Sequence, residues 1–184
     1  MIRLLALLSL LGILGGCANA PNCPSLPSGL GYCLQNSAET PAFSALQDVR
    51  LQRHALDERL ITQLEVDASG MRLVGLSPMG QRVLEARFDN KEARASSLAG
   101  DKLDARALLS MIQIATWPAE SVRVGLRWGW ELEEDVHIRR VLREDETALV
   151  IERHGTPPHF HQLIIRLPQA DLTLRVNDIE RTTQ

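Results

Sequence analysis

Apolar and polar residues alternate along several stretches of this chain, which is the pattern of half-buried β-strands. Residues 60–67 show it most clearly, with Leu, Thr, Leu and Val at every second position. Two further strands are predicted at residues 71–76 and 83–88, separated by a Ser-Pro-Met-Gly turn at residues 77–80. This part of the chain is therefore predicted to form a meander of hairpins.

The apolar spacing changes to three and four residues in the middle of the chain, as in an amphipathic helix. The stripe consists of Leu103, Ala107, Leu108, Met111, Ile112 and Ala115. Asp101 or Asp104 is expected to cap the N-terminus of this helix. Pro118 prevents its continuation beyond Trp117, and a shorter helix is predicted at residues 119–126.

Strand patterns resume after this helical centre and continue almost to the C-terminus. Five strands are predicted, at residues 128–132, 136–142, 147–153, 160–167 and 172–177. Acidic segments between them are expected to be solvated hairpin turns. The order of strands, helices and strands predicts an α+β fold, mainly antiparallel, with one or two helices packed against about eight strands.

The N-terminal residues have the pattern of a signal peptide, because Arg3 precedes an apolar run at residues 4–14 that is too short to span a bilayer. A Gly-Gly pair then stands directly before Cys17, which resembles the lipobox of bacterial lipoprotein precursors. The resemblance implies that residues 1–16 are removed and that Cys17 carries several acyl chains, enough for a stable anchor. Ala18, where an Asp would favour the inner membrane, favours the outer membrane. An ordinary signal peptide with a chance cysteine is the alternative.

Cys23 and Cys33 then form an even pair in an oxidising periplasm and are predicted to form a disulfide. A redox-active or metal-binding pair is the alternative, but the spacing matches neither C-x-x-C nor a zinc knuckle. Residues 17–39 lack apolar periodicity and are predicted to be a lipidated tether containing this ring. A single domain is predicted over residues 40–184.

Charge and motifs exclude several function classes. Removal of residues 1–16, which contain one charged side chain, leaves 168 residues with a net charge of −4, whereas nucleic-acid-binding domains are usually strongly basic. No later apolar stretch approaches the length of a membrane span. No phosphate-binding loop, nucleophile elbow or zinc-protease motif occurs, so neither a catalytic residue nor a cofactor is predicted.

Two stretches give the chain a resemblance to the LolB family, outer-membrane lipoproteins that receive other lipoproteins and insert them into that membrane. They are residues 73–84, LVGLSPMGQRVL, and residues 104–118, which begin with DARALL and end in Trp-Pro. A family of uncharacterised lipoproteins, with a domain of unknown function and often encoded with aryl polyene lipid biosynthesis, is the closer match. The resemblance covers most of the mature chain. It implies an unclosed β-barrel, a LolA/LolB-like half barrel, with helices as a lid over an apolar cavity for acyl chains.

Such a cavity needs apolar walls and a movable lid, and almost no polar chemistry. The candidate wall residues are Leu64, Leu73, Leu84, Phe88, Leu108, Met111, Ile112, Trp117, Trp128 and Trp130. An ordinary packed core is the alternative interpretation of the same residues. The resemblance also implies that Met79, at the predicted turn, contacts membrane or cargo. A single exposed apolar residue without a function is the alternative.

His154, His159 and His161 are the most enzyme-like feature of the chain. His159 and His161 would share one face of a strand, and such pairs can begin a metal site. A third ligand and a supporting shell are not evident in the pattern, so no metal site is predicted and metal binding by these histidines stays an alternative.

The sequence therefore predicts a lipid-anchored protein on the periplasmic face of the outer membrane that binds or transfers lipids, acyl chains or lipoproteins. Its expected partners are lipid or acylated cargo, the outer membrane and a periplasmic protein, but not nucleic acid. The second hypothesis is an assembly lipoprotein that docks onto a lipid-biosynthesis or export complex. A metal-dependent periplasmic enzyme is the third.

Overall fold

The structure, a computed structural model, describes residues 22–98, 105–157 and 159–183. Within these residues ten strands form one sheet. The strands are β1 (Phe43–Arg53), β2 (Leu56–Asp67), β3 (Gly70–Leu76), β4 (Arg82–Phe88), β5 (Ala93–Ser97), β6 (Glu131–Glu134), β7 (Ile138–Arg143), β8 (Glu146–Thr156), β9 (His159–Leu167) and β10 (Leu172–Thr183). The described α-helices are α1 (Ala105–Thr116) and α2 (Ala119–Gly125), and short 3-10 helices lie at Ser37–Glu39 and Pro168–Ala170.

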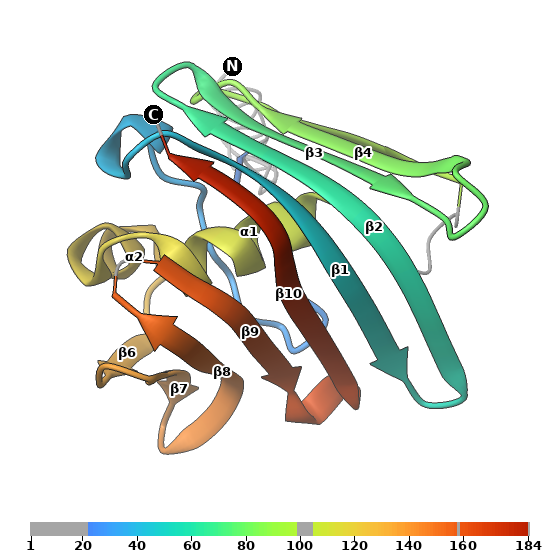
Figure 1. Cartoon of the computed structure of the whole chain (residues 1–184). Helices are drawn as coiled ribbons and strands as arrows, with labels where there is room; N and C mark the ends of the chain where they lie inside the picture. The colour runs from blue at the N-terminus through green and yellow to red at the C-terminus, as the bar shows by residue number, and fades with distance from the viewer. Residues whose placement is uncertain (1–21, 99–104, 158, 184) are drawn as a thin grey trace, which may run out of the picture.

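All neighbouring strands are antiparallel, in the order β5-β4-β3-β2-β1-β10-β9-β8-β7-β6. β5 and β6 are the edges of this described sheet and do not pair with each other, so the barrel is not closed. Figure 1 shows α1 crossing behind the central strands, on one face of the sheet. The predicted fold class, a mainly antiparallel open sheet with two helices, is confirmed.

β1 lies at the centre of the sheet, between β2 and β10, although its alternation is imperfect. Phe43, Ala45, Val49 and Leu51 are buried on one face, and Gln47 occupies the remaining position of that face. A polar residue in the inward register hides the period of two, and the sequence interpretation missed this strand for that reason.

α1 is buried on almost all sides, as a helix enclosed between two layers must be. Leu108 and Ile112 face the sheet and help to line a cavity against it. A segment from the N-terminal part of the chain passes over the other side of α1. Gln113 of the helix and Trp117, which directly follows it, donate side-chain hydrogen bonds to this segment. No helix in the described part of the chain is long and apolar enough to cross a membrane.

That segment, the strap (residues 22–36), belongs to the domain and is not the tether predicted from its composition. Its apolar side chains are buried in the core, each less than 5 % exposed: Leu26, Leu30, Tyr32 and Leu34. The side-chain amide of Gln113 accepts from the backbone N–H of Gln35 at 2.7 Å and donates to the carbonyl of Gln35 at 2.8 Å. Trp117 Nε1 donates to the carbonyl of Asn36 at 3.2 Å. Pro and Gly disrupt the periodicity of the strap, but they do not prevent its burial.

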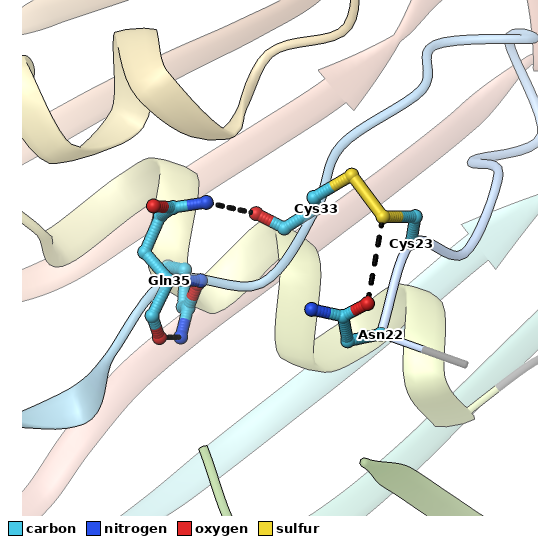
Figure 2. Close-up of a disulfide and its surroundings, with 5 residues drawn as sticks. Asn22, Cys23, Cys33 and Gln35 are labelled. Atoms are coloured by element: carbon cyan, nitrogen blue, oxygen red, sulfur yellow. Dashed lines mark hydrogen bonds between the residues drawn. A yellow bond between two sulfur atoms is a disulfide. The ribbon is translucent and has the colours of Figure 1, made fainter. Parts of the chain in front are cut away.

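A disulfide joins Cys23 to Cys33 and closes the strap on itself (Figure 2). The backbone N–H of Cys33 also donates to the carbonyl of Gly125 at 2.7 Å, which ties the ring to the end of α2. The disulfide therefore staples the segment that covers α1.

We expect the double substitution Cys23→Ser and Cys33→Ser to lower the free energy of unfolding by about 2–3 kcal/mol, because the unfolded chain regains the freedom of the opened loop. Thermal unfolding of variant and parent, with and without a thiol reductant, measures this effect. The reduced parent should match the variant, and the variant should not respond to the reductant. Equal melting temperatures of the oxidised parent and the variant would contradict the stapling role.

The remaining differences from the sequence prediction concern boundaries and short strands. The edge strand β5 was missed because four of its five residues are Ala or Ser and most of them are exposed. The strand predicted at residues 128–132 is observed only as β6, which begins at Glu131. The two helices lie where the sequence predicts them, and the capping roles of Asp101 and Asp104 fall outside the described residues.

Candidate functional site: an apolar cavity under α1

The sheet and α1 enclose a cavity with a free volume of about 40 Å³. Its walls are contributed by β1 (Gln47, Val49, Leu51), β2 (Leu60, Thr62, Leu64), β3 (Leu73), β4 (Leu84), β9 (Leu163, Ile165), β10 (Leu174, Val176, Arg181) and α1 (Leu108, Ile112, Thr116). All but four of these residues are aliphatic. The described wall of the cavity is therefore suited to hydrocarbon.

A groove of about 300 Å³ adjoins the cavity beside the β3–β4 turn. The two hollows share Leu51, Leu60 and Leu84. The other residues that line the groove are Leu56, Glu58, Arg59, Ser77, Pro78, Val83, Ser97 and Leu98. These three leucines separate the groove from the cavity, and an apolar molecule in the groove would contact them.

Two large apolar side chains are exposed here: Leu98 lines the groove, and Met79 directly follows Pro78, which also lines it. Met79 is 88 % exposed at the β3–β4 turn, and Leu98 is 81 % exposed at the end of β5. The turn is well defined, since Gly80 donates its N–H to the carbonyl of Ser77 at 2.8 Å and has a φ of 78°, which favours glycine. This geometry holds Met79 outward, away from the core.

Half of the ten predicted wall residues line the cavity: Leu64, Leu73, Leu84, Leu108 and Ile112. Phe88, Met111 and Trp117 are at most 1 % exposed, but they pack in the surrounding core and do not form its wall. An apolar pattern identifies buried positions, and it does not separate those that face a cavity from those that face protein.

The two remaining tryptophans lie away from the cavity. Trp130 is partly buried against the core, with the guanidinium of Arg143 5.8 Å from its ring centre. The assignment of Trp128 to the wall is wrong, because its side chain is 96 % exposed. Trp128 lies in the loop before β6, so the alternation inferred for residues 128–132 does not apply to it.

Polar groups gather at the end of the cavity formed by the start of β1 and the end of β10. Gln47 Nε2 donates to Asp178 Oδ1 at 2.8 Å, and Thr62 Oγ1 lies 3.4 Å from Gln47 Oε1. Arg181 Nε donates to the second oxygen of Asp178 at 2.6 Å. The hollow is therefore asymmetric, with an aliphatic end towards the groove and a polar end at Arg181.

The C-terminal end of α1 is fixed by an ionic cluster in which two arginines are buried and share one partly exposed glutamate. Arg139 Nη1 donates to the carbonyls of Ile114 and Trp117, at 2.8 and 2.7 Å, and so satisfies two carbonyls that the helix leaves open. Arg139 and Arg153 both bind Glu134 Oε1, at 2.9 and 3.0 Å. We refer to Glu134, Arg139 and Arg153 as the ionic anchor.

Tyr32 completes the attachment of the strap to α1. Burial raises the pKa of its phenol well above the ordinary value, and the charge of Glu39 adds to this rise. The phenol therefore stays protonated and donates to Gln113 Oε1 at 3.2 Å. Together with the ionic anchor, this contact holds the C-terminal half of α1 in place.

The family model described as "Protein of unknown function (DUF3261)" matches residues 44–180, which include every residue of the cavity wall except Arg181. The chain belongs to the DUF3261 family. No protein with a curated description matches the DUF3261 chain.

Several solved structures resemble the fold of this chain at low sequence identity. Two contain MucB: the Pseudomonas aeruginosa MucA/MucB complex, with 13 % identity and a TM-score of 0.42, and MucB with periplasmic MucA, with 14 % and 0.41. They cover 80 % and 81 % of the DUF3261 chain, which spans about half of each MucB chain (53 % and 52 %). A Vibrio parahaemolyticus domain described as an outer membrane lipoprotein-sorting protein is 7 % identical, with a TM-score of 0.38, and covers 80 % of this chain and 88 % of its own.

Among the side chains that the structure describes, no three His, Cys, Asp or Glu are arranged to hold a metal ion. His154 is about half exposed and its Nε2 lies 3.9 Å from Glu152. His161 is exposed on β9, and the side chain of His159 lies outside the described part of the structure.

Several wall residues of the cavity escaped the sequence prediction. Leu174 and Val176 lie on a strand that was predicted, at residues 172–177, and its alternation could have assigned them to the concave face. No alternation of apolar and polar residues marks Arg181 as a wall residue. It lies in a polar segment, because β10 extends six residues beyond the predicted end of the strand.

Proposed function

We propose that this DUF3261 protein is an envelope lipoprotein that binds an acyl chain, or the acyl chains of a lipid or lipoprotein, between α1 and the sheet. One observation carries the proposal. An aliphatic cavity under a single helix adjoins an open groove that is flanked by exposed Met79 and Leu98. Burial of apolar surface supplies the binding energy for such a ligand, so the role needs neither a cofactor nor catalytic residues.

Binding of a chain requires α1 to move. The free volume of about 40 Å³ is far below the roughly 150 Å³ of an engineered cavity that admits benzene. The C-terminal end of α1 is held by the ionic anchor and the strap, whereas Leu108, near its N-terminus, lies against the cavity. We propose that the N-terminal half of α1 lifts from β4 and β5 and admits the chain from the groove.

The groove has the features of a loading site. Met79 and Leu98 flank it with flexible aliphatic side chains that adapt to ligands of irregular shape. We propose that Met79 contacts the incoming cargo or the membrane from which it is taken. The aryl polyene lipids implied by the sequence resemblance are a natural first cargo to test, alongside saturated fatty acids.

The proposed location is the periplasmic face of the outer membrane, through lipid on Cys17. This anchor would hold the domain near its source of acyl chains. The mature chain of −4 net charge is not suited to nucleic acid, and a periplasmic protein is the other expected partner.

The test of ligand binding uses the full chain as Cys17→Ala, which omits the lipid, with an environment-sensitive apolar fluorophore and fatty acids as competitors. We expect the parent to bind the fluorophore and Leu108→Glu to bind it at least tenfold more weakly. Leu108 is 6 % exposed, and its carboxylate replacement would reach solvent through the groove as α1 lifts, so the melting temperature should fall by only a few degrees.

Val124→Glu is the matched control, since Val124 is 76 % exposed on the neighbouring helix and should tolerate the charge without a change in binding. A parent that binds no fluorophore, together with outright unfolding of Leu108→Glu, would show a sealed core and reject the proposal.

A second candidate role is docking onto a protein complex of lipid synthesis or export. Trp128 and Val124, 96 % and 76 % exposed, place apolar surface at the end of α2, away from the cavity wall. Trp is strongly enriched among residues that dominate protein interfaces. A stable protein that copurifies with the parent but not with Trp128→Ser would favour this role.

A further inference from the structure

The sheet splits where β9 and β10 separate. These strands pair from Leu167 and Leu172 as far as Gln162 and Asn177, and no further pairing between them is described. Beyond that point β10 continues to Thr183 with β1 as its partner, and the register with β1 shifts between Leu46 and Gln47. The bulge bends β10 and directs its last residues away from β9.

Hollows lie on both sides of this split, and Arg181 lines all of them. Outside, Arg181 lines a hollow of about 390 Å³ with Phe160, His161, Asp178, Ile179, Glu180 and Thr183. A smaller space of about 40 Å³ connects Arg181 with Phe43, Thr116 and Phe160. Inside, Arg181 belongs to the wall of the cavity under α1. The guanidinium therefore stands between solvent and the cavity, at the opposite end from the Met79 groove.

The guanidinium of Arg181 is held in place, but only one of its three nitrogens donates a hydrogen bond to a described residue. Its Nε donates to Asp178, its plane lies over Phe43 with the central carbon 4.4 Å from the ring centre, and the side chain is 17 % exposed. Neither terminal nitrogen has a hydrogen-bond partner among the described residues. Asp178 receives a second hydrogen bond from Gln47, so this carboxylate is fixed on one side of the guanidinium. The two Nη groups form a pre-oriented fork for another acceptor.

We infer that the preferred ligand is an acyl chain with an anionic oxygen group at one end, a carboxylate or a phosphate, and that Arg181 binds this group at the β9–β10 split. The chain then occupies the aliphatic cavity and points towards Leu84 and the groove. This inference rests on the proposed function and adds a polarity to it, with the head group at Arg181 and the tail towards Met79. Because Asp178 offsets part of the charge, the preference for an anionic ligand should be moderate.

The experiment compares three ligands of equal chain length, dodecanoate, dodecyl phosphate and dodecanol, below their micellar concentrations. Dissociation constants are measured by displacement of the fluorophore from the full chain as Cys17→Ala. We expect the parent to bind one or both anionic ligands about tenfold more tightly than dodecanol. Whichever anion binds more tightly identifies the head group as carboxylate or phosphate.

Three variants separate the role of Arg181 from general charge. Arg181→Gln should bring the anionic ligands to the affinity of dodecanol, and Arg181→Lys should keep part of the preference even if glutamine impairs folding. Asp178→Asn should increase the preference, because it removes the competing carboxylate. Arg175→Gln, at an exposed position of the same strand, is the control and should change nothing.

Equal affinity of the parent for dodecanol and both anions would overturn the inference and leave the proposed chain binding intact. An unchanged preference in Arg181→Gln would overturn it too. Absence of binding by all three ligands would instead reject the proposed function itself.

Discussion

Replacement of Glu134 by glutamine is expected to lower the free energy of unfolding by about 3 kcal/mol, in the range for breaking a buried ion pair from one side. Arg139 and Arg153 are 4 % and 5 % exposed, and Glu134 Oε1 accepts from both. The neutral amide leaves two buried cations without their shared counter-charge. The value lies at the lower end of that range because the Glu134 side chain is itself 22 % exposed.

The same substitution should change how stability depends on pH. Burial raises the pKa of Glu134, but its hydrogen bonds and ion pairs with Arg139 and Arg153 outweigh burial and hold the pKa below the ordinary range. The contribution of Glu134 is therefore fully present above the unfolded-state pKa of about 4.3 and is lost as the pH falls through the lower folded-state pKa. The free energy of unfolding of the parent should therefore fall as the pH is lowered below about 4.3. The Glu134→Gln variant should not show this part of the pH dependence.

Denaturant unfolding of parent and variant between about pH 3 and pH 7 measures both effects. Glu133→Gln is the matched control, since Glu133 is exposed on the same strand and its loss should change stability by less than about 0.5 kcal/mol. If Glu134→Gln were as stable as Glu133→Gln at neutral pH, the ionic anchor would have no role in holding α1. A Glu134→Gln protein that folds but binds the fluorophore more tightly would show that the anchor also restrains the lid.

Local pattern predicted most of this fold, and its failures have physical causes. Strands with one apolar face, such as β3 and β4, are evident from their sequence because each inward position is apolar. β1 was missed because Gln47 faces inward and is satisfied there by Asp178, a partner 131 residues away. Such a distant partner is brought close only by the tertiary fold, so the order of apolar and polar residues around Gln47 cannot indicate it.

The strap and the cavity show the same limit. Leu26, Leu30 and Leu34 recur every four residues, but the Pro and Gly between them exclude a helix, and their burial comes from packing in the core. Burial of this kind depends on a helix some 80 residues later in the chain. Whether a buried leucine faces a void or another side chain likewise depends on packing, so sequence predicted Leu84 and Met111 equally well as wall residues, and only Leu84 is one.

Loss of Cys17 is expected to remove membrane attachment completely while leaving the domain folded. Within the described residues the hydrophobic core begins at Leu26, in the strap, and we expect the domain to fold without the lipid on Cys17. Several acyl chains on one cysteine hold a protein on a membrane, since each buried CH₂ contributes about 0.8 kcal/mol. Without these acyl chains the protein should be released from the membrane.

The comparison uses the natural chain and a second chain that starts at Ala18 behind the cleavable signal peptide of a soluble periplasmic protein. The natural chain should incorporate labelled palmitate and fractionate with the outer membrane until detergent is added. The chain without Cys17 should carry no label, appear in the soluble periplasmic fraction and melt at the same temperature. Ala18→Asp should keep the label but shift to the inner membrane. Membrane association of the Ala18 chain, or absence of label on the natural one, would show that the Gly-Gly-Cys sequence is not a lipobox.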